Sequence, residues 1–446
     1  MKSINDVLNQ IGDFYLLAGE KELALTGTLI RRNNSIILDA RMPKDNLNCI
    51  SQHDIFQIWG VVCGTKVTLL DCLITLYFPF DSSSNYENIS AEPTEIIIGR
   101  SYAGDINITK ISASVEALNY MFSERLFEEN IRFSKENPSV LDFAYPKEIL
   151  AHDPDGEICL CRGFQHSWST NKIEYKFLPS IEYTFLKPTK IRSAIARIAS
   201  ARNLLSFFAD YYLPLENITF ADAQTAKVEN FTGLCDSLLY MNNTEDIKTP
   251  QKPFLIMTKK FSENFSTIWS NWLRFYNDSV YIPTLFYEII SNHSTRINRF
   301  LNLSQAVELY SDYYRRSEVA SIAREDGCRK TELPLKYRVE DVLTYLDECL
   351  DIPPEKRRRL AIAISKDRNF FTHYNKQRYE EPSFQELQAA NRFLRYVLLA
   401  IVYKTIGISS NDIKDCKKYF EYSILERDID VILKEKKGIE YTSLFE

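Results

Sequence analysis

The spacing of apolar residues changes from a strand-like to a helix-like period near the middle of this chain, and this change limits the folds it can adopt. Runs rich in β-branched and aromatic residues follow one another closely as far as residue 185. Their density indicates a sandwich or distorted barrel of about 180 residues. From Trp269 onward the apolar residues recur at helical spacing. The sequence therefore predicts an α+β protein with a β-rich N-terminal domain followed by an all-α helical bundle.

Individual elements follow from the same patterns. Strands are expected at Leu23–Ile30, Ile36–Met42, Phe56–Val62, Lys66–Phe78, Glu95–Ser101, Ile106–Val115, Glu157–Ser167 and Ile173–Phe185, with one more near Phe254–Lys260. Helices are expected at 117–129, 188–210, 282–292, 296–317, 338–350, 354–375, 384–407, 410–422 and 426–436.

The domain limits follow from where these patterns change. We expect a β-rich domain over residues 1–250, a connecting region over 251–284 and a helical domain over 285–446. The helix at 188–210 is basic, because no acidic residue lies between Glu182 and Asp210. Its basic face is expected either to be solvated or to contact RNA or a partner, and the pattern leaves both open.

Composition narrows the class of protein. The chain has 446 residues, 45% of them hydrophobic, and a formal net charge of −6, so any contact with phosphate must come from a local basic patch. Nine cysteines at irregular spacing and the lack of an apolar run near ~20 residues predict a cytoplasmic protein without a membrane span. Cys159 and Cys161 form the one close cysteine pair, and no metal or cofactor is expected.

The residues with the clearest chemical meaning are Arg368, Asn369 and His373, on the helix expected at 354–375. RNA can be cut without a metal when its own 2′-OH attacks the adjacent phosphate. Histidine can then move a proton to or from the reacting oxygens, and arginine can stabilise the charge on the phosphate. Asn369 lies one helical turn before His373 and is placed to orient the imidazole or contact phosphate.

The surroundings of this motif are basic. Residues 351–380 contain eight basic and four acidic side chains, a local charge of +4. On an ideal helix, however, Arg368 and His373 point about 140° apart. Joint action then requires a bent arginine side chain, a distorted helix end, or a site formed from two subunits. The alternative is structural: His373 would cap the helix C-terminus and Arg368 would form a surface ion pair.

At these residues the chain resembles the HEPN superfamily, whose catalytic signature is an arginine followed by a histidine after four to six residues. KDRNFFTHY (366–374) resembles its catalytic helix. NRFLNLSQAVELYSDYYRR (298–316) resembles the first long helix of the Apea-like subfamily, and NRFLRYVLLAIVYKTIGIS (391–409) resembles the helix that follows the motif there. The β-rich half, with WLRFYND (272–278) at its end, resembles the N-terminal domain of ApeA-type anti-phage proteins.

This resemblance implies a metal-independent endoribonuclease in an abortive-infection system, with a homodimeric HEPN domain and an N-terminal domain that receives a phage-derived trigger. RNA is the expected partner, with host tRNA as one candidate. Arg368 and His373 are then catalytic, with Asn369 as the polar residue after the arginine. The expected RNA contacts, some basic and some aromatic, are Lys366, Tyr374, Lys376, Arg315 and Arg316.

Two other functional classes stay open at this point. Some HEPN proteins only bind a protein partner or nucleic acid, so a non-catalytic adaptor is the alternative, although such a module has no need for His373. A metal-dependent nuclease is the third class, and the lack of clustered carboxylates near the motif in the sequence argues against it.

Overall fold

The computed structural model describes residues 4–32, 35–50, 54–77, 85–118, 131–133, 141–143, 149–169, 172–222, 238–241, 258–290, 294–328, 333–373, 380–418 and 422–435. Internal contacts divide the chain into two compact units. The first contains residues 1–119, 127–201 and 214–248, and the second contains mainly residues 202–213 and 249–446. The boundary between residues 201 and 202 lies within one helix. The domain limits expected at 250 and 284 stay a prediction.

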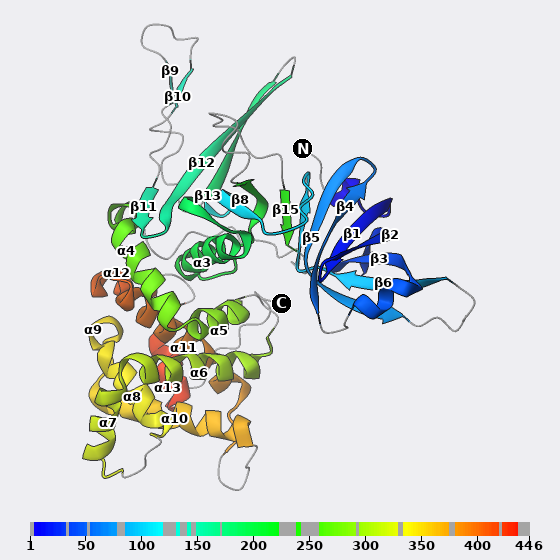
Figure 1. The fold of residues 1–446 in the computed structure, drawn as a ribbon. Coiled ribbons are helices and arrows are strands. Elements are labelled where there is room, and N and C mark those ends of the chain that lie inside the picture. Colours follow the sequence, from blue (N-terminus) through cyan, green and yellow to red (C-terminus); the bar gives the residue numbers. More distant parts are fainter. Residues whose placement is uncertain are drawn as a thin grey trace. The chain divides into compact units, whose positions relative to one another are not determined.

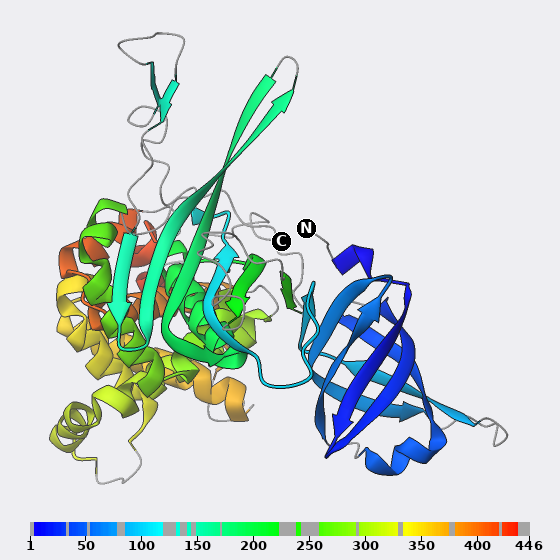
Figure 2. The same cartoon turned by 45° about the horizontal axis from the view of Figure 1, so that its top comes forward.

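A closed barrel of six antiparallel strands forms the N-terminal part of the first unit (Figure 2). Neighbouring strands follow the order β5-β4-β1-β2-β3-β6, and β6 pairs back with β5. Inward residues such as Phe14, Leu16, Ile58 and Leu69 are fully buried and fill the interior. The strands are β1 (Ile11–Ala18), β2 (Lys21–Arg32), β3 (Ser35–Pro43), β4 (Ile55–Val62), β5 (Thr65–Tyr77) and β6 (Tyr86–Glu92). Of the two expected forms, the barrel is confirmed.

A second group of strands continues from the barrel sheet through β7, in the order β7-β15-β14-β8-β13-β12-β11. The strands expected at Glu157–Ser167 and Ile173–Phe185 are confirmed, and β12 and β13 pair antiparallel from Gly156 opposite Phe185 to Ser169 opposite Lys172. The strands are β7 (Glu95–Ile98), β8 (Asn107–Ser114), β11 (Ile149–Asp153), β12 (Gly156–Ser169), β13 (Lys172–Lys190), β14 (Glu216–Asp222) and β15 (Leu238–Met241), beside a separate hairpin of β9 (Ile131–Phe133) and β10 (Leu141–Phe143).

The basic helix expected at 188–210 is α3 (Ile191–Ala209). Its first arginines pair with carboxylates of the β-rich unit: Arg192 with Asp71 and Glu95, and Arg197 with Asp155. These guanidinium groups are therefore neither simply solvated nor available to RNA, and both expectations for them are replaced by a structural role.

The second unit is helical. It contains α4 (Thr258–Asp278), α5 (Tyr281–Ile290), α6 (Arg296–Tyr314), α7 (Arg316–Glu325), α8 (Leu335–Tyr345), α9 (Asp347–Leu350), α10 (Pro354–His373), α11 (Phe384–Thr405), α12 (Ser410–Asp415) and α13 (Leu425–Ile432). The strand expected near 254–260 is wrong from Thr258 onward, because α4 begins there and buries Phe261, Phe265, Trp269 and Trp272 at helical spacing. Residues 254–257, and residues 119–129 of another expected helix, lie outside the described residues.

Three long helices form the centre of this unit (Figure 1). Helices α6 and α11 run parallel, since Asn391 Nδ2 donates to the Arg296 carbonyl (3.0 Å) and Tyr310 Oη lies 3.2 Å from Thr405 Oγ1. Helix α10 runs antiparallel to α6, because Phe371 packs against Phe300, 6.0 Å between ring centroids, and Arg368 reaches Glu308 farther along α6. The C-terminus of α10 and the N-termini of α6 and α11 therefore lie at one end of the unit.

Residues 202–213 join the helical unit through Asp210, which is fully buried and has a left-handed backbone (φ 56°). Arg395 Nε and Tyr422 Oη both donate to its carboxylate, at 2.7 and 2.5 Å. No helix in the described part of the chain is long and apolar enough to span a membrane.

Close backbone packing inside the barrel gives a test of the fold. A Cβ added to Gly60 would lie 2.2 Å from the Asp13 carbonyl oxygen, whereas one added to Gly104 would meet nothing within 4 Å. We expect Gly60→Ala to reduce the free energy of unfolding by about 1–3 kcal/mol, because the adjacent strand has to move. Gly104→Ala is the matched control and should be near neutral. Equal thermal unfolding of the two variants would contradict the barrel register.

Candidate functional site

Helix α10 carries the Arg368/Asn369/His373 motif and begins where the sequence predicts. Asp351 ends α9 with a left-handed backbone (φ 57°), and Pro354 occupies the first position of α10, where its missing N–H is not needed. The helix buries Leu360, Ile364 and Phe371 and stays α-helical through His373.

The positive charge at the start of α10 is neutralised within the helical unit. Each of four consecutive basic residues pairs with a carboxylate of another element: Lys356 with Asp430 (3.0 Å), Arg357 with Asp347, Arg358 with Asp326, and Arg359 with Glu435 (2.6 Å). Hydrogen bonds from Tyr337, Arg358 and Lys336 lower the pKa of Asp326 to about 2. The charge of these four residues is therefore balanced by carboxylates of the same unit.

Arg368 is bound by Glu308 of α6. Its Nη2 lies 3.3 Å from Glu308 Oε2, and its side chain is 30% exposed. The other oxygen of Glu308 pairs with Arg338 of α8, which also lies 3.1 Å from Asp312. Glu308 thus bridges two guanidinium groups, and Arg338 is almost completely buried. This arrangement fixes the direction of the Arg368 side chain.

His373 is exposed at the last position of α10, and the structure does not bring it into contact with Arg368. Asn369 is half-buried and Lys366 is exposed. Thr372 Oγ1 donates to the Arg368 carbonyl (2.8 Å), so the backbone between the two motif residues stays regular. Tyr374 and Lys376, which we expected to contact RNA, lie outside the described residues.

Two family models match this chain. Residues 10–272, more than half of the chain, match the ApeA N-terminal domain 1, and residues 301–412 match the Apea-like HEPN domain. This chain belongs to the ApeA N-terminal domain 1 family. Its ApeA-type architecture is the one that the sequence motifs resemble. HEPN domains are typically ribonucleases of defence systems. No curated protein and no solved structure matches the chain.

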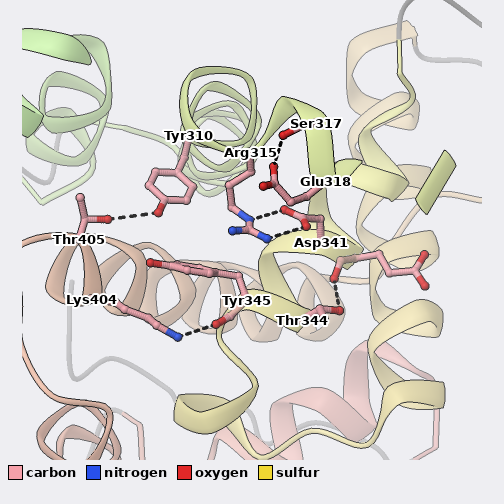
Figure 3. A network of polar contacts seen from close by, with 10 residues as sticks. Tyr310, Arg315, Ser317, Glu318, Asp341, Thr344, Tyr345, Lys404 and Thr405 are labelled. Carbon is pink, nitrogen blue, oxygen red and sulfur yellow. Dashed lines mark hydrogen bonds and ion pairs between the residues drawn. The ribbon is translucent and has the colours of Figure 1, made fainter. Parts of the chain in front are cut away.

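Arg315, an expected RNA contact in the HEPN domain, is bound to Asp341 instead of being free. Its Nε and Nη2 donate to the carboxylate at 2.6 and 2.9 Å, and its guanidinium lies 4.4 Å from the centre of the Tyr345 ring (Figure 3). Burial raises the pKa of Asp341, and the Arg315 guanidinium opposes that increase. The pair joins the end of α6 to α8, while the neighbouring Arg316 is exposed.

The Tyr345 ring is also the contact for a second cation. Lys404 Nζ lies 4.3 Å from the ring centre and donates to the Tyr345 carbonyl at 2.7 Å (Figure 3). The aromatic residues at the end of α6 serve the same packing, because Tyr310 is buried and the rings of Tyr310 and Tyr345 are 6.2 Å apart. These contacts give the C-terminal end of α6 a structural role.

No motif in the sequence pointed to Glu308, Arg338 or Asp341. Each lies on an amphipathic helix with no motif around it, and its partner is 26 to 60 residues away in the chain. An acidic residue on α6 facing the inner side of α10 could have been suspected only if the helix order were already known.

A metal site would need several ligand side chains close together. No group of three or more His, Cys, Asp or Glu side chains that could hold a metal occurs among the described residues. His152 pairs with Glu157 (3.3 Å), and Asp153 accepts hydrogen bonds from the backbone N–H groups of Asp155 and Gly156. The β11–β12 turn therefore accounts for these three polar residues.

Asp367, next to Arg368, has a strongly altered pKa. Burial raises the pKa of its carboxyl from 3.8 to about 7, and the nearby Glu386 adds to the increase, while Lys434 and Lys366 oppose it. Lys434 Nζ itself lies 2.7 Å from Glu380 and 3.6 Å from Glu386. Asp367 thus lies in a partly buried place between two acidic and two basic side chains, and burial is the main cause of its raised pKa.

This gives a pH-dependent prediction. The folded protein binds the Asp367 proton more tightly than the unfolded chain does. The contribution of this proton to the free energy of unfolding is therefore complete below about pH 4 and is lost as the pH rises through about 7. Asp367→Asn should therefore stabilise the protein at pH 8, by at most about 4 kcal/mol because the side chain is partly exposed. Thermal unfolding at several pH values should show this gain in stability becoming smaller toward pH 4. A gain that is independent of pH would contradict the assigned pKa.

Proposed function

We propose that this protein is a metal-independent endoribonuclease of a cytoplasmic anti-phage system, in which Arg368 and His373 cut RNA. In the reaction the 2′-oxygen forms a bond to the adjacent phosphorus, and the bond to the 5′-oxygen breaks. His373 accepts the 2′-OH proton or donates a proton to the leaving 5′-oxygen. Arg368 stabilises the negative charge on the phosphoryl oxygens. The products are a 2′,3′-cyclic phosphate and a 5′-OH.

The observation that carries this proposal is the contrast between the two motif residues. His373 is exposed at the end of a regular helix, where it is open to a substrate, while Arg368 is oriented by Glu308. A guanidinium has five N–H donors, and the bond to Glu308 uses one of them. The remaining donors are sufficient for two phosphate oxygens, so the Glu308 contact is compatible with catalysis and limits the motion of the arginine.

The regular form of α10 favours a site built from two subunits. Among the three ways of bringing Arg368 and His373 together, a distorted helix end does not fit a helix that is regular through His373. A bent arginine does not fit a guanidinium that points at α6. We therefore propose a homodimer through the HEPN domain, in which Arg368 of one protomer faces His373 of its partner.

The proposal also includes a candidate substrate, a candidate trigger and further candidate RNA contacts. Host tRNA is a candidate substrate, a phage-derived protein is a candidate trigger at the N-terminal domain, and Asn369, Lys366, Tyr374, Lys376 and Arg316 are candidate RNA contacts. Arg315 is a weaker candidate, since an RNA phosphate would have to compete with Asp341.

A non-catalytic adaptor is the second candidate function, and one observation favours it. The ion pair between Arg368 and Glu308 is what a purely structural arginine would form. The exposed His373 distinguishes the two functions, because an adaptor has no use for an imidazole at this position.

Cleavage by single variants tests the proposal. Purified protein should cut cellular RNA in EDTA and leave 2′,3′-cyclic phosphate ends. His373→Ala should reduce the rate by about 10²–10⁴-fold, since a proton-transfer group is lost. Arg368→Ala should give a loss of similar size through the phosphate charge. Both should keep the wild-type far-UV circular dichroism spectrum. Equal cleavage by wild type and His373→Ala would exclude the proposed mechanism, whereas RNA binding without any cleavage by wild type would favour the adaptor.

Mixing the two inactive variants tests the shared site. If Arg368 and His373 act across the dimer, a mixed dimer of Arg368→Ala and His373→Ala has one intact site. Random exchange of subunits should then restore about a quarter of the wild-type rate. If both residues act within one protomer, no mixed dimer has an intact site, and activity should stay at the level of the single variants.

A further inference from the structure

The N-termini of α6 and α11 lie at the same end of the helical unit. Thr295 caps α6, and Ser383 caps α11 in a capping box with Glu386. Asn391, the eighth residue of α11, donates to the carbonyl of Arg296, the first residue of α6, so α11 extends beyond the start of α6. The Arg296 side chain lies over this extending part of α11, because it contacts the Phe384 ring.

The exposed surface over these N-termini is formed by Arg296 and Phe384. The guanidinium of Arg296 lies 4.2 Å from the centre of the Phe384 ring, and Phe384 is 50% exposed. Within the described residues Arg296 makes no ion pair, unlike Arg357, Arg358 and Arg359 of α10. A guanidinium held flat over a ring keeps its in-plane N–H donors free for an anion.

Further basic and polar side chains lie near this surface, beside the Glu386 carboxylate of the capping box. Arg299, one turn after Arg296, has a lowered pKa because it is partly buried and lies near Arg395 and Arg296. Gln388 and Asn391 share one face of α11 with Phe384. Their side-chain oxygens are buried, and no donor reaches them from the described residues. Hydrogen-bond acceptors and positive charge are thus found beside an exposed aromatic ring.

This surface lies at the same end of the unit as His373. The ring of Phe300, the residue after Arg299, is 6.0 Å from the ring of Phe371. Phe371 precedes His373 by two residues, a rise of about 3 Å along the helix. A chain bound at Arg296 and Phe384 would therefore extend toward His373.

We propose that Arg296 and Phe384 form a subsite for one unpaired nucleotide of the RNA, next to the phosphate that is cut. The base stacks on the exposed Phe384 ring beside Arg296, and the adjoining phosphate is held by Arg296. An exposed ring is accessible to a base only when that base is unpaired, so the subsite selects single-stranded segments. This inference rests on the proposed ribonuclease function.

Binding and cleavage together test the subsite. In the full-length protein carrying His373→Ala, binding of a short labelled single-stranded RNA is measured by fluorescence anisotropy at several salt concentrations. Arg296→Ala should weaken binding about tenfold and reduce the salt slope by about 0.7. Phe384→Ala should weaken it about tenfold with little change in slope. In chains with His373 intact, both changes should raise KM far more than they lower kcat.

Arg324→Ala is the matched control, because Arg324 is exposed on α7 and donates to a carbonyl of its own helix, that of Ala320. If all three variants bind RNA equally while wild type cleaves it, the subsite is wrong and the ribonuclease stands. If wild type never cleaves but binding depends on Arg296 and Phe384, the subsite stands and the ribonuclease fails. Absence of both binding and cleavage in wild type overturns both.

Discussion

The carboxylate of Glu308 is the interaction on which the helical unit and its candidate site both depend. It joins α6 to Arg338 on α8 and to Arg368 on α10. Arg338 is nearly completely buried and would be left with Asp312 alone if the Glu308 carboxylate were removed, which should weaken the packing of α6 against α8. The group that holds three helices together therefore also sets the direction of Arg368. Stability and function cannot be changed independently at this position.

Charge pairing inside each unit involves basic residues that stand close together in the sequence. Arg192 and Arg197 of α3 and Arg357 of α10 all bind carboxylates of their own unit. The number of basic residues in a segment is therefore a poor guide to its surface charge. An arginine that makes no ion pair within the described residues, such as Arg296, is more informative, since no carboxylate of this part of the chain balances its charge.

Local patterns predicted the elements better than the contacts between them. The pairing of β2 with β3 and the position of α10 follow from residue period, turn residues and Pro354, whereas β1 and β6 were not expected. Closure of the barrel does not follow from local patterns, because the pairing of β5 with β6 depends on curvature that no short segment encodes. Helix α4 was partly missed, because aromatic residues such as Phe261 and Phe265 favour strands and helices alike when they are buried.

The candidate site shows the same difference between local positions, which the sequence predicts, and contacts between helices, which it does not. The sequence places His373 at a helix end and Arg368 on a different side, and the structure agrees with both positions. It could not place Glu308, because recognition of Arg368 by an acid 60 residues earlier depends on helix packing. An arginine fixed toward α6 and a histidine exposed at the end of α10 cannot meet on one regular helix. On the proposed mechanism a single protomer is then inactive, and assembly of two HEPN domains becomes the step that any activating signal must control.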